Sequence, residues 1–493
     1  MKTMWPDMST SDALSEHQKN VIKQATISRL GVLTGSPGTG KTHCAAAILK
    51  EVVRQNSLND VSVAAPTGKA AIRIQSLMTR HGLNLQATTI HRLLQVSRNG
   101  RDKRGWAFQF NADNPLPCRF LLIDEASMLD VSLANSLFSA CSDGSHVLVV
   151  GDSGQLPPVG HGAPLRDFIA GGLACGELSE IRRNAGMIVE ACVAIRAGKP
   201  FKYCTKYAEL DLRPESEGGT GKNLLHIETS SPEESLDALR VLLARWKRSG
   251  EFDPIWDVQP LVAMNDKSEV SRVPINRMLQ GELNPEILTA APALDAAGKK
   301  PPRNPFRVND KIICLKNGMI ELASGFDSAD STGKPGIYSN YNGNATSEDI
   351  ADQLAGDTYV ANGEIGAVVA VEPRVTYAKF TYPDRLIKIP MGKVEDDDGK
   401  EGGGGGDQKG AGCDFALAYA VTTHKAQGSQ WPAIIVMIDK EAARVSSCEH
   451  HYTSISRAER LCVTIGSMST MLRQCRKVSL INRKTFLKEL LQG

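Results

Sequence analysis

Short apolar runs alternate with amphipathic stretches along the first part of the chain. Each run is rich in branched aliphatic residues and ends near a glycine, a proline or an acidic residue; the runs cover residues 31–35, 61–66, 119–126 and 146–152. Between them, segments such as 42–55 and 129–141 repeat apolar positions at helical spacing. Buried parallel strands with crossover helices produce this rhythm. We therefore predict a doubly wound α/β domain over residues 1–200.

The same rhythm returns towards the end of the chain. Residues 257–264 predict a strand that is followed by a helix through Asn284. Three later apolar runs complete a second parallel sheet, at residues 419–428, 433–438 and 461–467. We predict that this second α/β domain is built from residues 201–302 and 413–493.

The intervening residues 303–412 have a different pattern. Three segments alternate apolar and polar side chains between turn residues: 306–315, 359–371 and 385–391. This alternation predicts a small barrel-like β insertion. Segment 321–356 is rich in Ser, Asp, Asn and Gly, and segment 395–412 is glycine-rich and acidic. We expect both to be mobile and interpret the second as a surface linker.

Length and charge narrow the classes of function. A chain of 493 residues suggests two to four domains, each with its own core. The 57 Lys and Arg residues against 55 Asp and Glu residues leave a formal charge of only +2. This balance argues against a histone-like polycation and against an acidic disordered chain. A nucleic-acid-binding surface would therefore have to be built locally, from clustered Lys and Arg.

Cysteine usage and hydropathy bear on the compartment. The eleven cysteines contain no C-x-x-C pair, which argues against a disulfide framework and a zinc knuckle and suits a reducing cytosol. Cys448, His450 and His451 come nearest to a ligand cluster, and we favour ordinary side chains over a metal site there. Residues 1–15 lack an apolar signal-peptide core, and no run approaches 18 apolar residues. We expect a soluble, intracellular protein without a membrane partner.

A glycine-rich segment carries the first chemistry. It follows an apolar run, precedes a helical stretch and fits the pattern G-x-x-x-x-G-K-T; its residues are Gly35, Ser36, Pro37, Gly38, Thr39, Gly40, Lys41 and Thr42. This context is that of a P-loop, whose backbone N–H groups and helix N-terminus bind phosphate. We expect Lys41 to reach the β- and γ-phosphates of a nucleotide and Thr42 to ligate Mg²⁺.

Two further strand ends supply acidic and polar partners. Asp124 and Glu125 follow four apolar residues, so Asp124 is expected to hold Mg²⁺ and Glu125 to act as the general base that activates water. Gln155 follows the apolar run 146–152 and precedes two prolines. It suits a sensor of the γ-phosphate or of the attacking water, although a tight turn with an exposed Gln is an alternative.

The order of these motifs carries a family resemblance. DEASMLD (124–130), GDSGQLPPV (151–159), YAVTTHKAQG (419–428) and YTSISRAER (452–460) resemble the superfamily 1 DNA helicases, and most of all the RecD/Dda branch that moves 5′ to 3′ on single-stranded DNA. The resemblance implies two RecA-like P-loop motor domains. It also implies a pin insertion at about residues 95–118 in the first domain, and an SH3-like β-barrel insertion in the second.

The resemblance assigns further nucleotide-site residues. Gln18 matches the Q motif and would read adenine, which is compatible with a capping box with Ser15. Arg183 aligns with the family's first arginine motif, but Arg182 and Asn184 on either side depart from the family pattern and leave open which arginine reaches phosphate. Arg457 matches the arginine motif of the second domain and would stabilise transition-state charge, a structural salt bridge being the alternative. Gly428 is expected at the nucleotide.

Three polar segments resemble the family's DNA-binding motifs. They contribute Pro66, Thr67 and Lys69; Thr89, His91 and Arg92; and Thr423, His424 and Lys425. Their hydroxyl and cationic groups suit DNA phosphates, although each segment could be an ordinary polar loop. In the expected pin, Trp106, Phe108 and Phe110 alternate, so they could stack on a base or a terminal base pair. The alternative is that this aromatic face packs on the first domain.

These features together predict an ATP- and Mg²⁺-dependent DNA helicase. We expect it to work as a monomer in the cytoplasm of a bacterium or a phage-infected host. Its partners would be single-stranded DNA and single-strand/duplex junctions, and replication or recombination proteins are possible further partners. Two alternatives stay open: a translocase acting on RNA, and a nucleotide-gated DNA-binding switch or loader that hydrolyses ATP without separating strands.

Overall fold

The computed structural model of the chain describes residues 5, 8, 14–102, 105–180, 186–213, 217–285, 304–316, 318–323, 357–372, 374–381, 384–390, 415–479, 483, 485 and 487–492. The chain divides into two compact units. The first is formed by Met1–Pro274 with Val421–Gly493, and the second by Ile275–Ala420.

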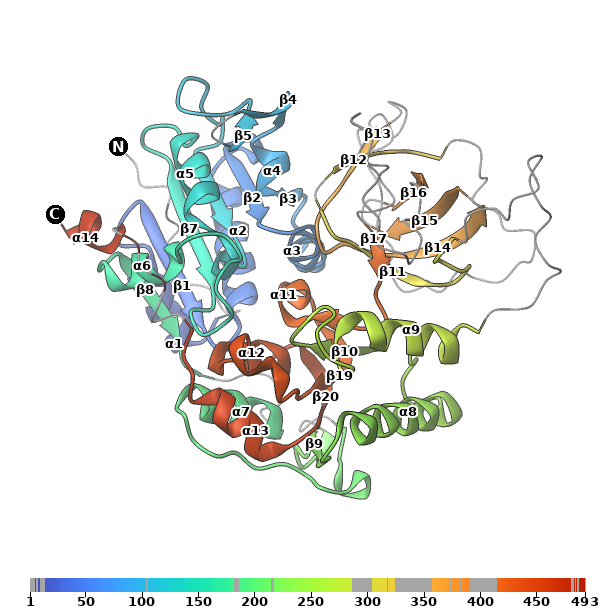
Figure 1. The fold of residues 1–493 in the computed structure, drawn as a ribbon. Coiled ribbons are helices and arrows are strands. Elements are labelled where there is room, and N and C mark those ends of the chain that lie inside the picture. The colour runs from blue at the N-terminus through green and yellow to red at the C-terminus, as the bar shows by residue number, and fades with distance from the viewer. Residues whose placement is uncertain are drawn as a thin grey trace, which may run out of the picture. The chain divides into compact units, whose positions relative to one another are not determined.

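The first unit contains a six-stranded parallel sheet in the order β3-β2-β6-β7-β1-β8 (Figure 1). Its strands are β1 (Leu30–Gly35), β2 (Val61–Ala65), β3 (Ala87–Thr89), β6 (Phe120–Ile123), β7 (His146–Gly151) and β8 (Ala174–Leu178). Every neighbouring pair in this sheet runs parallel. The prediction of a doubly wound α/β domain is confirmed.

Helices cover both faces of this sheet because its strands are apolar on both sides. Three helices pack on the face that carries Leu33 and Val63: α1 (Glu16–Ala25), α2 (Lys41–Gln55) and α3 (Gly68–Arg80). The face that carries Val32 and Ala64 is covered by α4 (Ile90–Leu93), α5 (Val131–Ser139), α6 (Pro164–Ala170) and α14 (Leu487–Gln492).

The first unit also contains a second parallel sheet, in the order β18-β10-β19-β20-β9. Its strands are β9 (Leu224–Ile227), β10 (Val258–Val262), β18 (Val421–Thr422), β19 (Trp431–Met437) and β20 (Ala458–Ile465). The helices in this part are α7 (Gly186–Arg196), α8 (Pro232–Ser249), α11 (Thr423–Ala426), α12 (Cys448–Ile455) and α13 (Met468–Cys475). Helix α7 packs against α12, β9 and β20, which favours a domain boundary before residue 186 rather than at 200.

The second unit is built around an antiparallel sheet in the order β16-β15-β14-β11-β17. Its strands are β11 (Lys311–Cys314), β14 (Ile365–Glu372), β15 (Val375–Thr381), β16 (Asp384–Pro390) and β17 (Phe415–Leu417), with β12 (Gly318–Glu321) and β13 (Asp357–Val360) forming a separate pair. Helix α9 (Arg272–Leu283) contains the point at which the two units divide. This architecture agrees with a β insertion, and its SH3-like character stays a prediction.

The strand predicted from residue 306 begins only at Lys311, because Asn309 has a positive φ of 71° and turns the chain before the strand. The Gly-rich segment 395–412 lies outside the described residues, as does most of segment 321–356.

A hairpin formed by β4 (Val96–Asp102) and β5 (Gly105–Phe108) lies where the pin was predicted (Figure 1). Its second strand is shorter than expected. Phe110 lies beyond it, and its backbone N–H donates to the carbonyl of Leu94 at 3.1 Å. The predicted aromatic strand through Phe110 therefore ends at Phe108.

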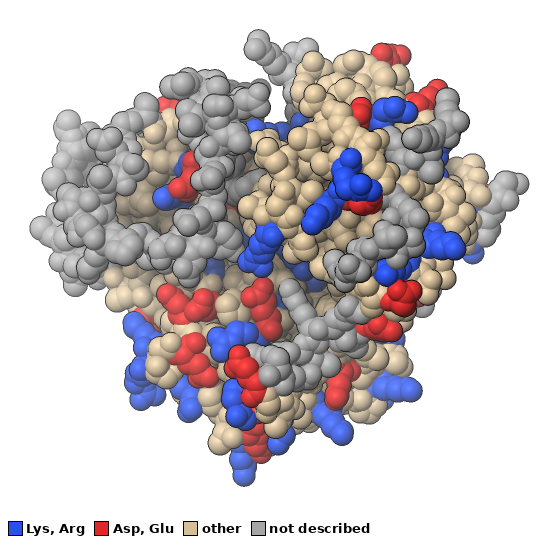
Figure 2. All heavy atoms as spheres, turned by 180° about the vertical axis from the view of Figure 1, so that it is seen from behind, with Lys and Arg blue, Asp and Glu red and all other residues tan. Residues whose placement is uncertain are grey.

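Charged residues of both signs are interspersed over the lower part of the face in Figure 2. This distribution agrees with the small net charge of +2. Among the described residues, no helix combines the length and the apolar character that are needed to cross a bilayer.

Candidate nucleotide site and nucleic-acid interface

The P-loop joins β1 to α2 and depends on its glycines. A Cβ atom at Gly35 would lie 2.7 Å from Thr39 Oγ1 and 2.8 Å from the carbonyl oxygen of Leu178, so only glycine fits there. Gly40 has a φ of 90° and stands as the N-cap of α2 without a side-chain cap. The N–H groups at the start of α2 are therefore left available for an anion.

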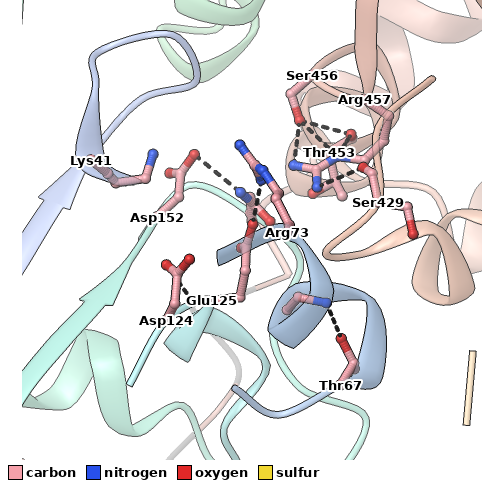
Figure 3. Close-up of polar contacts among 12 residues, drawn as sticks. Lys41, Thr67, Arg73, Asp124, Glu125, Asp152, Ser429, Thr453, Ser456 and Arg457 are labelled. Carbon is pink, nitrogen blue, oxygen red and sulfur yellow. Dashed lines mark hydrogen bonds and ion pairs between the residues drawn. The ribbon is translucent and has the colours of Figure 1, made fainter. Parts of the chain in front are cut away.

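Lys41 folds back over this loop. Its ammonium donates to the carbonyl oxygen of Gly35 at 2.6 Å and to that of Ser36 at 3.1 Å. Burial lowers the pKa of Lys41, and the carboxylates of Asp152 and Glu125 oppose that shift. In Figure 3, Lys41 and Asp152 point toward one another. The ammonium thus lies among carbonyls and carboxylates, where phosphate oxygens could replace the carbonyl partners.

Three carboxylates lie after the neighbouring strands β6 and β7. Asp124, Glu125 and Asp152 are all buried. Burial, and then the charge of Glu125, raises the pKa of Asp124 to about 6. A buried carboxyl whose negative charge is this poorly compensated suits a bound cation. Asp124 therefore fits the expected Mg²⁺ ligand, with the Thr42 hydroxyl in the first turn of α2 as the second protein oxygen.

Glu125 has a partner that the sequence did not reveal. Its carboxylate accepts a hydrogen bond from Arg73 Nη1 at 3.0 Å, from helix α3 (Figure 3). Glu125 also has a φ of 53°, a left-handed conformation that is uncommon for a residue with a side chain. The side chain is therefore held in a specific place after β6.

Gln155 is buried, which contradicts the alternative of an exposed turn residue. Its Nε2 lies 3.4 Å from Asp152 Oδ2, and its Oε1 has no hydrogen-bond partner within the described residues. An unpaired buried amide oxygen is costly unless a ligand or water satisfies it. This geometry suits a group that contacts the nucleotide or the attacking water.

The segment after Gln155 is bonded to the second sheet region. The backbone N–H of Leu156 donates to Thr453 Oγ1 at 2.8 Å, and the carbonyl of Leu156 accepts from Gln427 Nε2 at 2.9 Å. The hydroxyl of Tyr452 donates to Asp152 Oδ2 at 2.7 Å. Residues of α12 and of the α11 loop therefore contact the ends of the first sheet directly.

Arg457 is fully buried beside these contacts. Its guanidinium donates to the carbonyl oxygens of Thr453 and Ser429 at 3.1 and 3.3 Å, and to Ser456 Oγ at 3.0 Å (Figure 3). Burial lowers the pKa of Arg457, and the nearby charge of Glu125 opposes the shift. None of these partners is a carboxylate, so Arg457 does not form the salt bridge that was the alternative to a catalytic role. A structural role would instead consist of binding the backbone carbonyls of Thr453 and Ser429.

Gln18 is the third helical residue of the predicted capping box, whose N-cap is Ser15, and it lies against the P-loop. The Ser15 side chain accepts from the Gln18 N–H, and the Gln18 side chain accepts from the Ser15 N–H. The Nε2 atom of Gln18 is buried without a partner among the described residues, and it would lie 3.0 Å from a Cβ atom at Gly40. One donor is therefore free beside the P-loop, as reading an adenine requires.

Arg183 lies outside the described residues, so its role stays a prediction. The structure brings a different arginine to the loop. Arg196, at the end of α7, donates to Ser36 Oγ at 2.9 Å and lies 5.7 Å from the centre of the Tyr452 ring. No sequence motif marks Arg196, so its contact with the P-loop was not predictable from the sequence.

The first predicted DNA segment lies at the N-terminus of α3. Thr67 is the N-cap, and its hydroxyl accepts from the N–H of Ala70 at 3.3 Å. Lys69 Nζ lies 4.7 Å from the centre of the Trp431 ring. Gly428, expected at the nucleotide, instead approaches this helix, because a Cβ atom there would lie 3.1 Å from Thr67 Oγ1. Pro66 directly precedes the cap.

The second predicted segment is also a helix start. Thr89 caps α4 by accepting from the N–H of Arg92 at 3.2 Å. His91 lies 5.9 Å from Phe108 between ring centres, and both Phe108 and Phe110 pack against the core of the first sheet. This packing favours the alternative interpretation for these two rings. The side chain of Trp106 lies outside the described residues.

The third predicted segment requires a correction. Thr423 is 1% exposed, and its hydroxyl bonds with His450 Nε2 at 2.8 Å and with Ser454 Oγ at 2.9 Å. Its hydroxyl is hydrogen-bonded inside the protein, so the expectation that this side chain binds a DNA phosphate was wrong. His424 and Lys425 are only partly buried, and burial lowers the pKa of His424.

The residues that the sequence analysis missed share one property. Arg73, Tyr452, Thr453 and Gln427 have partners far away in the chain, and three of them lie inside motifs that were quoted for other residues.

Among the described residues, no group of three or more His, Cys, Asp or Glu side chains is arranged to hold a metal ion.

Comparisons with known proteins agree with these features. A family model described as an AAA domain matches residues 18–161, and one described as the UvrD-like helicase C-terminal domain matches residues 417–465. The ATP-dependent RecD2 DNA helicase of Deinococcus radiodurans is 26% identical over 479 residues, which cover 95% of this chain and 52% of that protein. The RecBCD enzyme subunit RecD of Mycobacterium tuberculosis is 26% identical over 480 residues, covering 92% of this chain and 70% of that subunit.

The chain thus spans about half the length of the Deinococcus relative. A crystal structure of Pif1 helicase from Bacteroides, in complex with ADP-AlF3 and ssDNA, aligns with a TM-score of 0.48 and 18% identity over 94% of both chains. The two family matches fall on the P-loop sheet and on the second sheet in the order that the motifs predict, and the relatives match along nearly the whole chain. These matches confirm the resemblance of the chain to the RecD-like superfamily 1 helicases.

Proposed function

We propose that this protein is an ATP-dependent DNA helicase that translocates 5′ to 3′ along single-stranded DNA and separates duplex. One observation carries the proposal: residues of both parallel sheets meet at the P-loop and the acidic strand ends. Asp152 accepts from Tyr452, and Leu156 bonds with both Thr453 and Gln427. A nucleotide bound at Lys41 would therefore bear directly on contacts between the two sheet regions. The name of the RecD2 relative, an ATP-dependent DNA helicase, supports the same activity.

The residues at this site suit phosphoryl transfer to water. Asp124 and Thr42 would hold Mg²⁺, which neutralises phosphate charge when it is bound. Lys41 would exchange its carbonyl partners for phosphate oxygens, and Glu125 would accept a proton from the attacking water. Arg457, which carries a permanent charge in a buried place, would stabilise the charge that develops on the phosphoryl group.

Work on DNA would follow from the same contacts. Thr67 and Lys69 lie at the start of α3, and Gly428 approaches this helix start from the second sheet region. Binding and hydrolysis of ATP would alternately tighten and release the contacts between the two sheets. If each sheet region holds DNA phosphates, the alternation moves the protein along the strand. Backbone contacts of this kind discriminate sugars poorly, so RNA is a second possible track.

A switch or loader ATPase is the second candidate. One observation favours it: Phe108 and Phe110 pack against the first core rather than lying free to stack on bases. A protein without a strand-separating aromatic surface could still bind DNA in a nucleotide-dependent way.

Unwinding of tailed duplexes decides between these functions. The protein is mixed with ATP, Mg²⁺ and fluorescent duplexes that carry a 5′ or a 3′ single-stranded tail of DNA, and with matched duplexes that carry RNA tails. Preferential opening of the 5′-tailed DNA is expected. Preferential opening of the 3′-tailed DNA would overturn the polarity. Hydrolysis that DNA stimulates without any opening would favour the switch, and equal use of RNA tails would favour the broader translocase.

A further inference from the structure

The ion pair between Arg73 and Glu125 connects two elements with different expected tasks. The Arg73 Nη1 to Glu125 Oε1 distance is 3.0 Å, and the carboxylate side chain is 8% exposed while the arginine side chain is 31% exposed. Glu125 follows strand β6 at the acidic end of the first sheet. Arg73 belongs to α3, whose N-terminus is an expected DNA contact. The pair therefore joins the hydrolytic site to the DNA-facing helix.

The ion pair with Arg73 engages the Glu125 carboxylate, the expected general base for hydrolysis. A general base must direct a free lone pair at the water that it activates. Glu125 Oε1 instead accepts a charge-assisted hydrogen bond from the guanidinium, so this oxygen already has a donor other than water. Figure 3 shows the Glu125 carboxylate directed at Arg73. While this contact is made, Oε1 is engaged and the carboxylate is held turned toward α3.

Helix α3 can transmit a displacement to this pair. Arg73 lies five residues after Gly68, which is about 8 Å along the helix axis from its start. Gly68–Arg80 is one continuous helix, so its start and Arg73 move together as one rigid segment. A ligand held at the N-terminus of α3 therefore acts on the Arg73 side chain through the helix itself.

The second sheet region also bears on this helix start. Lys69 Nζ lies 4.7 Å from the Trp431 ring centre, and a Cβ atom at Gly428 would lie 3.1 Å from Thr67 Oγ1 and 3.3 Å from Ala70 Cβ. A phosphate that takes Lys69 would withdraw it from Trp431. Changes at the start of α3 are thus coupled to both sheet regions.

We propose that Arg73 is a positioning residue that withholds Glu125 from water until single-stranded DNA binds at the start of α3. DNA binding shifts α3, breaks the Arg73–Glu125 contact and frees the carboxylate for general-base chemistry. The inference rests on the proposed function, because it requires ATP hydrolysis through Glu125. It adds a reason why turnover depends on DNA: the same helix holds the strand and the base.

Steady-state hydrolysis of full-length variants tests this assignment. Arg73→Met keeps the aliphatic stem and removes the charge; Arg73→Lys keeps a cation; Arg80→Ala removes an exposed arginine from the other end of the same helix. Turnover is measured without DNA and with saturating oligo(dT), together with the affinity for a fluorescent ATP analogue. Arg73→Met is expected to raise the DNA-independent rate about tenfold or more, the loss of one charge-assisted contact, and to reduce the stimulation by DNA accordingly.

The controls separate this role from a merely structural one. Arg73→Lys and Arg80→Ala should keep the DNA stimulation of the unchanged protein, and the nucleotide affinity should stay the same in all variants. Adding Glu125→Gln to Arg73→Met should abolish the gained turnover. A uniform loss of turnover in Arg73→Met, with and without DNA, would overturn the inference. An unchanged protein that hydrolyses ATP equally with and without DNA would overturn it too, while leaving the ATPase assignment intact. No hydrolysis in either condition would contradict the proposed function itself.

Discussion

At the scale of single residues, Lys41 donates its hydrogen bonds to the same loop that is expected to bind phosphate. Its ammonium donates to the carbonyl oxygens of Gly35 and Ser36, and burial lowers its pKa against the opposing charges of Asp152 and Glu125. A buried ammonium is costly unless it is well paired. A bound triphosphate would supply the negative charge that this environment only partly provides.

Replacing this ammonium should separate nucleotide binding from folding. In Lys41→Ala the carbonyls of Gly35, which is buried at the end of β1, and of Ser36, which is half-buried, lose a donor, so we expect the free energy of unfolding to fall by about 1 kcal/mol. Hydrolysis with DNA should fall by at least a hundredfold, since a phosphate-clamping charge contributes on the order of 3 kcal/mol to the transition state. Phosphate release, sampled at fixed times, measures the loss of hydrolysis, and thermal unfolding measures the change in stability.

Lys41→Arg serves as the matched control, because it keeps the charge and changes the geometry. It should fold like the unchanged protein and hydrolyse poorly. Hydrolysis in Lys41→Ala close to that of the unchanged protein would contradict the role given to the ammonium.

At the scale of elements, α12 is unusual because all eight of its residues, Cys448–Ile455, are buried although most are polar. Each buried polar group therefore needs a partner. His451 Nε2 bonds with Gln474 Oε1 at 2.8 Å, His450 Nε2 with Thr423 Oγ1 at 2.8 Å, and Tyr452 with Asp152. The same helix therefore carries both buried histidines and the residues that contact the ends of the first sheet, Tyr452 and Thr453.

This burial predicts a loss of stability in mild acid. Burial lowers the pKa of His451 from its ordinary 6.5 to about 4. Between these values the unfolded chain binds a proton that the folded protein excludes, so the free energy of unfolding falls as the pH falls below about 6.5. From pH 7.5 to pH 5.0 the contribution of His451 is about 2 kcal/mol.

Urea unfolding at the two pH values measures this contribution. His451→Gln should have a pH dependence that is shallower by that amount, whereas His161→Gln, which changes an exposed histidine, should leave the dependence unchanged. Equal slopes for the protein and for His451→Gln would show that His451 does not titrate as an interior group.

The elements also show what the sequence can and what it cannot predict. Strands β1, β2, β6 and β7 were predictable because apolar runs between turn residues are a local signal, and the P-loop was predictable because its chemistry lies within eight consecutive residues. The end of strand β5 depends on the hydrogen bond from the backbone N–H of Phe110 to the carbonyl of Leu94. The position of Phe108 depends on its ring contact with His91. Packing of this kind leaves no local pattern.

The same distinction applies to the candidate site. Asp124 and Glu125 were identified because they directly follow an apolar strand, and Gln155 because it comes four residues after one and precedes two prolines. Thr423 was assigned to DNA because its segment resembles a DNA-binding motif of the family and a hydroxyl suits phosphate, whereas its hydroxyl bonds with His450 and Ser454 in the interior. Arg73 escaped notice because its partner lies 52 residues later and on another element. Long-range pairs of charges are decided by the fold and not by the pattern around either residue.

At the scale of the whole molecule, net charge proved uninformative about the partner. The formal charge of +2 averages over faces on which acidic and basic side chains are interspersed, as Figure 2 shows for one of them. Binding of a strand depends instead on the few cations that meet phosphates. The predicted track contains Lys69, Arg92 and Lys425, each from a different polar segment.

Salt dependence distinguishes a local track from the average charge. Each phosphate neutralised on a single strand contributes about −0.7 to the slope of log affinity against log salt concentration, so three contacts give about −2. Lys69→Met should reduce the magnitude of the slope by about 0.7, and Lys425→Met by a similar amount. Lys247→Ala, which removes an exposed lysine from α8, changes the net charge equally but should leave the slope as it is. Fluorescence anisotropy of labelled oligo(dT) between 50 and 300 mM salt, about a sixfold range, measures all three. If Lys247→Ala reduced the slope as much as Lys69→Met, binding would follow the overall charge of the protein, and the three segments would lose their assignment as the DNA track.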